Sequence, residues 1–194
     1  MRVLVLFAHP LETSFVAALH VRAVETLRAR GHYVDDLDLY AERFDPVMSR
    51  RTFIDYLDLT ANRAQAGAYV ERLLAAEALV LVSPVWHDGF PAILKGFFDC
   101  VFLPGVVFRI DETGVFRPIL GNIKRLAAVC AYGADRRRTA QMGDPTRRFV
   151  KRNLGLLIPA GSRCEHVALY EMDAATAPRR AQHLRRVTRV FNGW

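Results

Sequence analysis

The sequence predicts an α/β protein whose centre is a doubly wound, five-stranded parallel sheet with helices on both faces. Three observations predict it. Short apolar runs rich in β-branched residues are typical of strands buried on both faces of a sheet. Segments with the apolar spacing of amphipathic helices separate these runs, and the alternation favours crossover connections between parallel strands. The chain has 194 residues, so we expect a single domain over residues 1–194.

The first part of the chain predicts a βαβ unit. Val3–Ala8 is an apolar run that fits a buried strand, and Ser14–Arg30 has the apolar stripe of a helix that ends at Gly31. Tyr33–Leu39 is expected to form the second strand. Residues 40 to about 62 have an irregular pattern, and we expect them to cap the edge of the sheet.

The middle of the chain continues the alternation. We expect a helix over Gln65–Ala76, a buried strand over Ala78–Val82 and a helix over Ala92–Phe102. Pro91 suits the first turn of this last helix, because its fixed φ is already helical. The apolar runs on either side of a turn within Leu103–Ile119 predict an excursion that resembles a β-hairpin.

The last part of the chain supplies two more strands and two helices. Leu126–Ala131 and Cys164–Tyr170 are expected to be the fourth and fifth strands. A polar loop is expected over Tyr132–Pro145, and helices over Thr146–Leu156 and Pro178–Phe191.

The composition argues against a membrane protein, a secreted disulfide-rich protein and a metal-binding protein. No stretch approaches the roughly 20 apolar residues of a membrane helix, and His9 and Pro10 interrupt the apolar start before a signal-peptide core forms. We therefore expect a cytoplasmic protein that does not insert into a membrane. The three cysteines lack CxxC or Cys/His spacing, which favours free thiols over a disulfide framework, and no metal site is expected.

The chain is basic, with a formal net charge of +7, and the excess arginine lies in its last third. Such a balance is compatible with nucleic-acid binding. No helix-turn-helix or RNA-binding signature accompanies it, so we expect no nucleic-acid partner. Solvated helix faces account for most of these arginines, and attraction of an anionic cofactor is the next interpretation.

Ligands of open α/β sheets bind beyond the carboxyl ends of the strands, so the loops that follow the strands carry the candidate site. The first loop lacks the GxGxxG fingerprint of a dinucleotide site. Thr13 and Ser14 stand at a helix start, where hydroxyls and unpaired N–H groups favour an anion. An ordinary N-cap is the alternative. His9 at the preceding strand end favours phosphate binding.

Two further loops follow buried strands. In the loop over residues 84–91, Trp86 is expected to be exposed and Gly89 permits close approach of a backbone, which suits a flat aromatic cofactor. A rigid turn with Trp86 in the core is the alternative. After the fourth strand, Tyr132 and Gly133 are candidates to contact the same ring.

Three stretches resemble the flavodoxin-like NAD(P)H:quinone oxidoreductase family. They are Val5-Leu6-Phe7-Ala8-His9-Pro10 with Thr13-Ser14-Phe15, then Asp38-Leu39-Tyr40 with Phe44-Asp45-Pro46-Val47-Met48-Ser49, and finally Pro91-Ala92-Ile93-Leu94-Lys95-Gly96-Phe97-Phe98-Asp99 with Val101-Phe102. The third stretch is the most specific, and the likeness covers about residues 2 to 135 well.

The resemblance implies a flavin-dependent NAD(P)H oxidoreductase that transfers a hydride to a quinone-like small molecule and works as a homodimer. It implies a non-covalent flavin, FAD with FMN as the alternative, and NADH or NADPH as the donor. The implied cofactor residues are His9, Thr13, Ser14 and Phe15 at the phosphates, Pro84, Val85, Trp86 and His87 along the isoalloxazine, and Tyr132 and Gly133 on the far side. His87 is also the candidate catalytic residue, as a hydrogen-bond donor to the reduced quinone; a solvent-facing loop histidine is the alternative.

The third loop departs from the family. The hydroxyl residues that usually face the flavin are replaced within Cys130–Ala134, and Thr139–Asp144 lacks the tyrosine and histidine of the best-known branch.

Two other functions therefore stay open. One is a flavodoxin-type electron carrier, which the positive charge disfavours; the other is a redox-sensing ancillary subunit of a membrane transporter. Arg136–Arg138 are candidates to meet a phosphate of NADPH.

Overall fold

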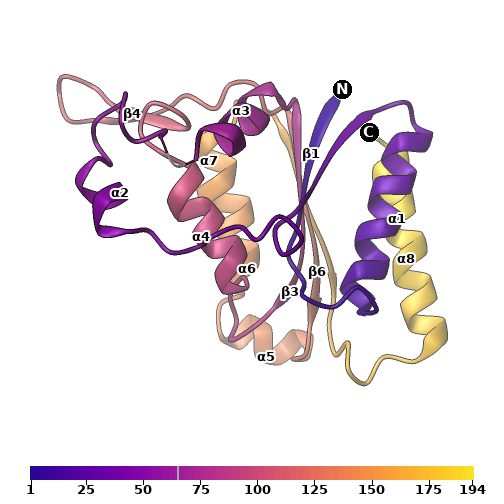
Figure 1. Ribbon diagram of the computed structural model, residues 1–194. Coiled ribbons are helices and arrows are strands. Elements are labelled where there is room, and N and C mark those ends of the chain that lie inside the picture. The colour runs from indigo at the N-terminus through magenta and orange to yellow at the C-terminus, as the bar shows by residue number, and fades with distance from the viewer. Residues whose placement is uncertain (65) are drawn as a thin grey trace.

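The computed structural model describes residues 1–64 and 66–194, and its centre is a parallel sheet (Figure 1). The strand order is β2-β1-β3-β6-β7. The strands are β1 (Arg2–Phe7), β2 (Tyr33–Asp38), β3 (Ala78–Val85), β6 (Arg125–Tyr132) and β7 (Arg163–Leu169). All pair in parallel, which confirms the predicted doubly wound α/β fold and its five strands.

Helices cover both faces of this sheet. Helices α1 (Phe15–Ala29) and α8 (Ala177–Asn192) lie side by side on one face, while α3 (Gly67–Ala75) and α4 (Ala92–Val101) cover the other (Figure 1). The remaining helices are α2 (Arg50–Ile54), α5 (Arg136–Gln141), α6 (Pro145–Arg148), η1 (Phe149–Leu154) and α7 (Gly155–Leu157). Gln65, the first residue of the helix predicted over Gln65–Ala76, lies outside the described residues. None of the described helices is long and apolar enough to cross a membrane.

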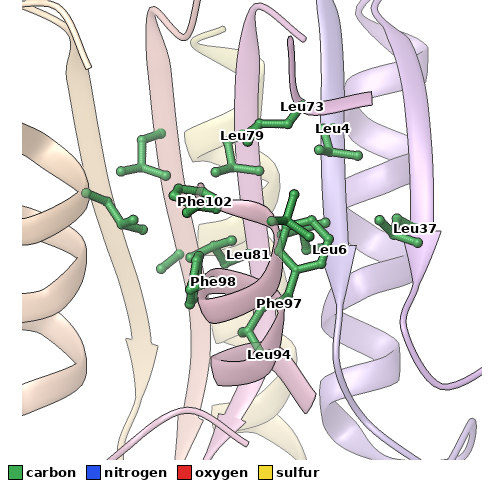
Figure 2. Packing of buried hydrophobic residues seen from close by; sticks show 14 of the residues in the cluster. Leu4, Leu6, Leu37, Leu73, Leu79, Leu81, Leu94, Phe97, Phe98 and Phe102 are labelled. Carbon is green, nitrogen blue, oxygen red and sulfur yellow. The ribbon is translucent and has the colours of Figure 1, made fainter. Parts of the chain in front are cut away.

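The core has two layers because successive side chains of a strand point to opposite faces of the sheet. In β1, Val3 and Val5 face α1 and α8, whereas Leu4 and Leu6 face α4. Figure 2 shows the α4 layer, where Phe97 and its neighbours cover the leucines of the sheet. Burial on both faces explains why these strands are continuous apolar runs.

Several parts of the chain differ from the sequence prediction. The sequence predicts strand ends at Val82 and Ala131, but β3 extends to Val85 and β6 to Tyr132. The two strands stay paired up to these residues, where Val85 faces Tyr132. Helix α5 occupies part of the predicted loop over residues 132–145, and α2 lies in the stretch expected to be irregular. The helix expected over Thr146–Leu156 is present, but its middle, η1, is a π-helix.

The predicted hairpin is confirmed. Strands β4 (Phe108–Ile110) and β5 (Phe116–Pro118) pair antiparallel outside the main sheet. Asp111 shapes the connection, since its carboxylate accepts hydrogen bonds from the backbone N–H groups of Thr113 and Val115.

Gly96 of α4 lies against the backbone of Pro46. A Cβ atom built on Gly96 would lie 2.3 Å from the Cβ and the carbonyl oxygen of Pro46, far inside van der Waals contact. Two of the stretches that carry the family resemblance therefore touch each other here. The glycine is required because the chain before α2 crosses α4 at a distance that leaves no room for a side chain.

Gly96→Ala is expected to lower the free energy of unfolding by about 1–3 kcal/mol, the usual range for an overpacked site. Gly67→Ala is the matched control, because a Cβ on Gly67 of α3 meets nothing within 4 Å. That control should be neutral or stabilising by about 0.4–1 kcal/mol. Urea denaturation measures both variants; equal stabilities would show that the contact with Pro46 is not tight.

Candidate functional site

Three loops meet at one edge of the sheet. Strands β1, β3 and β6 are neighbours and run in the same direction, so the residues that follow them emerge together. In Figure 1 this carboxyl edge is the lower one, where α5 also lies. Ligands of open α/β sheets bind at such an edge.

The first loop ends at the start of α1. The Oγ of Ser14 accepts a hydrogen bond from the backbone N–H of Ala17 at 3.0 Å, so Ser14 is the N-cap. The N–H groups of Phe15 and Val16 have no hydrogen-bond partner among the described residues. No acidic residue lies in the first turn of α1. The cap and an anion site therefore coexist here, since free N–H groups and the helix dipole both attract negative charge.

Arg180 brings a positive charge from α8 to the same loop. Its guanidinium carbon lies 5.9 Å from the centre of the Phe15 ring. The Nε of Arg180 is buried and has no partner among the described residues. From the sequence, this arginine is expected to belong to a solvated helix face. Its spacing from the buried residues His183 and Val187 is i, i+3, i+7, and this spacing could have placed it on the inward side of the helix.

The second loop is a two-residue turn. Trp86 and Gly89 exchange backbone hydrogen bonds of 3.0 Å each, and the residues between them, His87 and Asp88, have φ of 49° and 60°. Two left-handed residues in succession form a type I′ turn. Trp86 is 42% exposed, as predicted, and its ring centre lies 6.0 Å from that of His9. The first and second loops therefore touch.

A cavity of about 260 Å³ opens between the second and third loops. Its walls include four of the residues that the sequence marks as cofactor contacts: Val85, His87, Tyr132 and Gly133. Asp88, Ala134 and Arg138 complete it. We call it the flavin-side cavity, after the cofactor that the family resemblance implies.

The other predicted cofactor residues lie outside this lining. His9, Thr13, Ser14 and Phe15 belong to the first loop and the start of α1, while Trp86 stands beside the cavity. Pro84 is buried within β3, where it pairs with Ala131. The structure thus brings the predicted residues to one edge of the sheet in two groups, a helix start and a cavity.

Tyr132 lines the flavin-side cavity and is only 2% exposed. Its hydroxyl donates to Oδ1 of Asp144 at 3.0 Å and lies 3.1 Å from Nε2 of His166. Burial raises the pKa of Tyr132 and lowers the pKa of His166 to about 4. Both groups are therefore neutral at neutral pH.

The sequence pattern does not indicate this cluster, because residues 139–144 contain neither a tyrosine nor a histidine. The structure supplies a histidine from β7, more than thirty positions from Tyr132 along the chain. A single histidine in a strand that mixes polar and apolar residues carries no signal of this contact.

Comparisons with known proteins agree with this geometry. A family model described as flavodoxin-like fold matches residues 1–190. The NAD(P)H dehydrogenase [quinone] 1 of Cavia porcellus is 36% identical over 153 residues, which are 69% of this chain and 54% of that protein. An FMN-dependent NADH:quinone oxidoreductase of Ruegeria pomeroyi is 31% identical over 143 residues, 67% of each chain.

Solved structures show the same architecture. The NAD(P)H:quinone oxidoreductase from Methanothermobacter marburgensis superposes with a TM-score of 0.81 at 23% identity, covering 98% of this chain and 97% of that one. The chain spans about half the length of the curated relatives that are 36% identical to it. Since the family model covers nearly all of the sequence and the strand order agrees with it, the chain belongs to the flavodoxin-like fold family.

Proposed function

We propose that this protein is a flavin-dependent NAD(P)H oxidoreductase that passes two electrons, as a hydride, to a quinone or a similar small electrophile. The observation that carries the proposal is the meeting of an anion-attracting helix start and the flavin-side cavity at one edge of the sheet. The names of the relatives from Cavia porcellus and Ruegeria pomeroyi support it.

The residues at this edge fit the two ends of a flavin nucleotide. The free N–H groups of Phe15 and Val16, with the Arg180 guanidinium nearby, suit a phosphate. Thr13 adds a hydroxyl to this end. Val85 and the ring of Trp86 suit a flat aromatic ring, as does the backbone at Gly133. When bound, the flavin supplies the hydride chemistry, and the protein positions it and shapes its surroundings.

We propose FMN as the flavin. The sequence favours FAD with FMN as the alternative, but the Ruegeria pomeroyi relative is named for FMN. The first loop offers one compact set of anion-binding groups around the start of α1, which suits a single phosphate.

We assign His87 the role of hydrogen-bond donor to the acceptor. The tight turn between Trp86 and Gly89 holds it at the rim of the flavin-side cavity. An imidazole there can donate to an oxygen that gains negative charge during reduction. Tyr132 has a different role, because its hydroxyl points to Asp144 and His166; it holds the wall of the cavity in place.

We propose that the protein works as a homodimer in the cytoplasm. Five apolar side chains in the segment over residues 47–59 are each at least 56% exposed: Val47, Phe53, Ile54, Leu57 and Leu59. An exposed apolar group of this kind marks an interaction surface, and a second copy of the chain is the partner we assign to it. The free thiols of Cys100, Cys130 and Cys164 fit a reducing compartment.

The purified protein is expected to show the visible spectrum of a flavin, and anaerobic NADH or NADPH should bleach it. Extraction and chromatography of the pigment should yield FMN. A flavin that no nicotinamide nucleotide bleaches would indicate an electron carrier. A colourless protein that takes up neither FMN nor FAD would refute the proposed function.

His87→Gly should slow reoxidation of the reduced protein by a quinone by about 10²-fold, the lower range for a lost proton or hydrogen-bond donor. Glycine adopts the left-handed backbone of this position without steric cost, so the turn should survive. Stopped-flow absorbance separates the two half-reactions, and bleaching by the nicotinamide donor is the internal control. Equal slowing of both half-reactions would argue against the assigned role.

Phe53→Glu combined with Leu57→Glu should convert the dimer to a monomer, because each charge would be buried without a partner. Val21→Glu on α1 is the control, since Val21 is also exposed and lies elsewhere. Size-exclusion chromatography with light scattering measures the mass. A monomeric unmodified protein, or a dimer that resists the double substitution, would contradict this interface.

A further inference from the structure

A second cavity, of about 430 Å³, lies beside the edge strand β7. Helices α5, α6 and α8 form its other walls. We call it the basic cavity. The side chains that matter for its chemistry are Arg136, Arg147, Arg186, Asp144, His166 and Tyr170.

The three arginines leave the basic cavity with an uncompensated positive charge. Within the described part of the chain, none of them has a carboxylate within the 4.0 Å of an ion pair. Asp144 lines the cavity, but its Oδ1 already accepts from the Tyr132 hydroxyl at 3.0 Å and from the N–H of Arg147 at 3.2 Å. Its Oδ2 faces the hydroxyl of Tyr170 at 3.4 Å. The carboxylate thus belongs to the wall, and the guanidinium groups remain available to a ligand.

The donor set suits a phosphate. Guanidinium groups bind phosphate oxygens through paired N–H donors, and three of them around one cavity match a dianion with three acceptor oxygens. Arginine stays charged at all physiological pH values, whereas burial lowers the pKa of His166 to about 4 and leaves it neutral. The positive charge of the cavity therefore comes from the arginines.

The basic cavity lies one side chain away from the flavin-side cavity. Tyr132 lines the flavin-side cavity with its ring, and its hydroxyl contacts Asp144 and His166 of the basic cavity. On α5, Arg138 lines the first cavity and Arg136 lines the second. The two cavities are therefore neighbours along α5, and an elongated ligand that crosses this helix would have one end in each.

We propose that the basic cavity binds a phosphomonoester and that, in turnover, this group is the 2′-phosphate of NADPH. The cavity thereby selects NADPH over NADH as the electron donor. This inference rests on the proposed function, because it assigns the donor of that same reaction. Arg147 and Arg186 are its specificity-determining residues, since they approach the cavity from two different helices, α6 and α8.

Isothermal titration with adenosine 2′,5′-bisphosphate and with 5′-AMP tests the site on the full chain. The bisphosphate should bind at least about tenfold more tightly than 5′-AMP, and Arg147→Gln with Arg186→Gln should remove this difference. Arg185→Gln is the matched control, because Arg185 is exposed on α8 and is not among the described residues that line either cavity. Thermal unfolding checks that each variant is folded.

Steady-state kinetics test the selection of the donor. The double variant should raise the KM for NADPH by about tenfold and leave the KM for NADH unchanged. Equal binding of the bisphosphate and 5′-AMP to the unmodified protein would overturn the proposal, as would an equal loss in Arg185→Gln. Inorganic phosphate is the third probe: if the double variant loses phosphate binding but keeps its preference for NADPH, the cavity serves a free phosphate compound and the proposal fails.

Failure of this inference is distinguishable from failure of the proposed function. The titrations measure equilibrium binding and need no turnover. A protein without flavin would refute the oxidoreductase, while the comparison of the two nucleotides would still decide whether the basic cavity recognises a 2′-phosphate.

Discussion

The pairing of β3 with β6 runs to the last residue of each strand, where Val85 faces Tyr132. Both loops that form the flavin-side cavity start from this point. If either strand ended earlier, the turn at His87 and the backbone at Gly133 would lose their common support. Parallel strands place their carboxyl ends at the same edge, so one ladder of backbone hydrogen bonds sets the position of the candidate site.

Tyr132 connects this ladder to the rest of the molecule. It is the last residue of β6, yet its hydroxyl is held by Asp144 before α6 and by His166 of β7. Burial keeps the phenol and the imidazole neutral, so the cluster holds one charge at most, on the carboxylate. The Tyr132 side chain is buried, and its contacts with two separate elements hold it in one orientation. We infer that it separates the flavin-side cavity from the basic cavity and fixes the spacing between them.

Two surface regions differ in their chemistry. Arginines line the cavities along β7 and α8, while five exposed apolar side chains lie close together in the segment over residues 47–59. The second region stands apart from the sheet at α2 (Figure 1). Pro46, which directly precedes this segment, packs against Gly96 of α4. This contact gives the segment a defined position although its helix is short. The proposed roles follow this division, with the nucleotide at the basic edge and a second copy at the apolar one.

Sequence alone determined the features that depend on neighbours along the chain. Apolar periodicity located the five strands and the long helices, and turn residues located the hairpin. An N-cap at Thr13 or Ser14 was the alternative to phosphate binding at the first loop, and the structure shows Ser14 as the cap. Exposure of Trp86 was also predicted correctly.

Tertiary structure decided the features that depend on distant partners. They are the extension of β3 and β6, the hydrogen bond between Tyr132 and Asp144, the contact of Tyr132 with His166, and the approach of Arg180 to Phe15. Each of these contacts joins residues from separate elements, and a pattern read along one chain carries no information about which elements become neighbours in space.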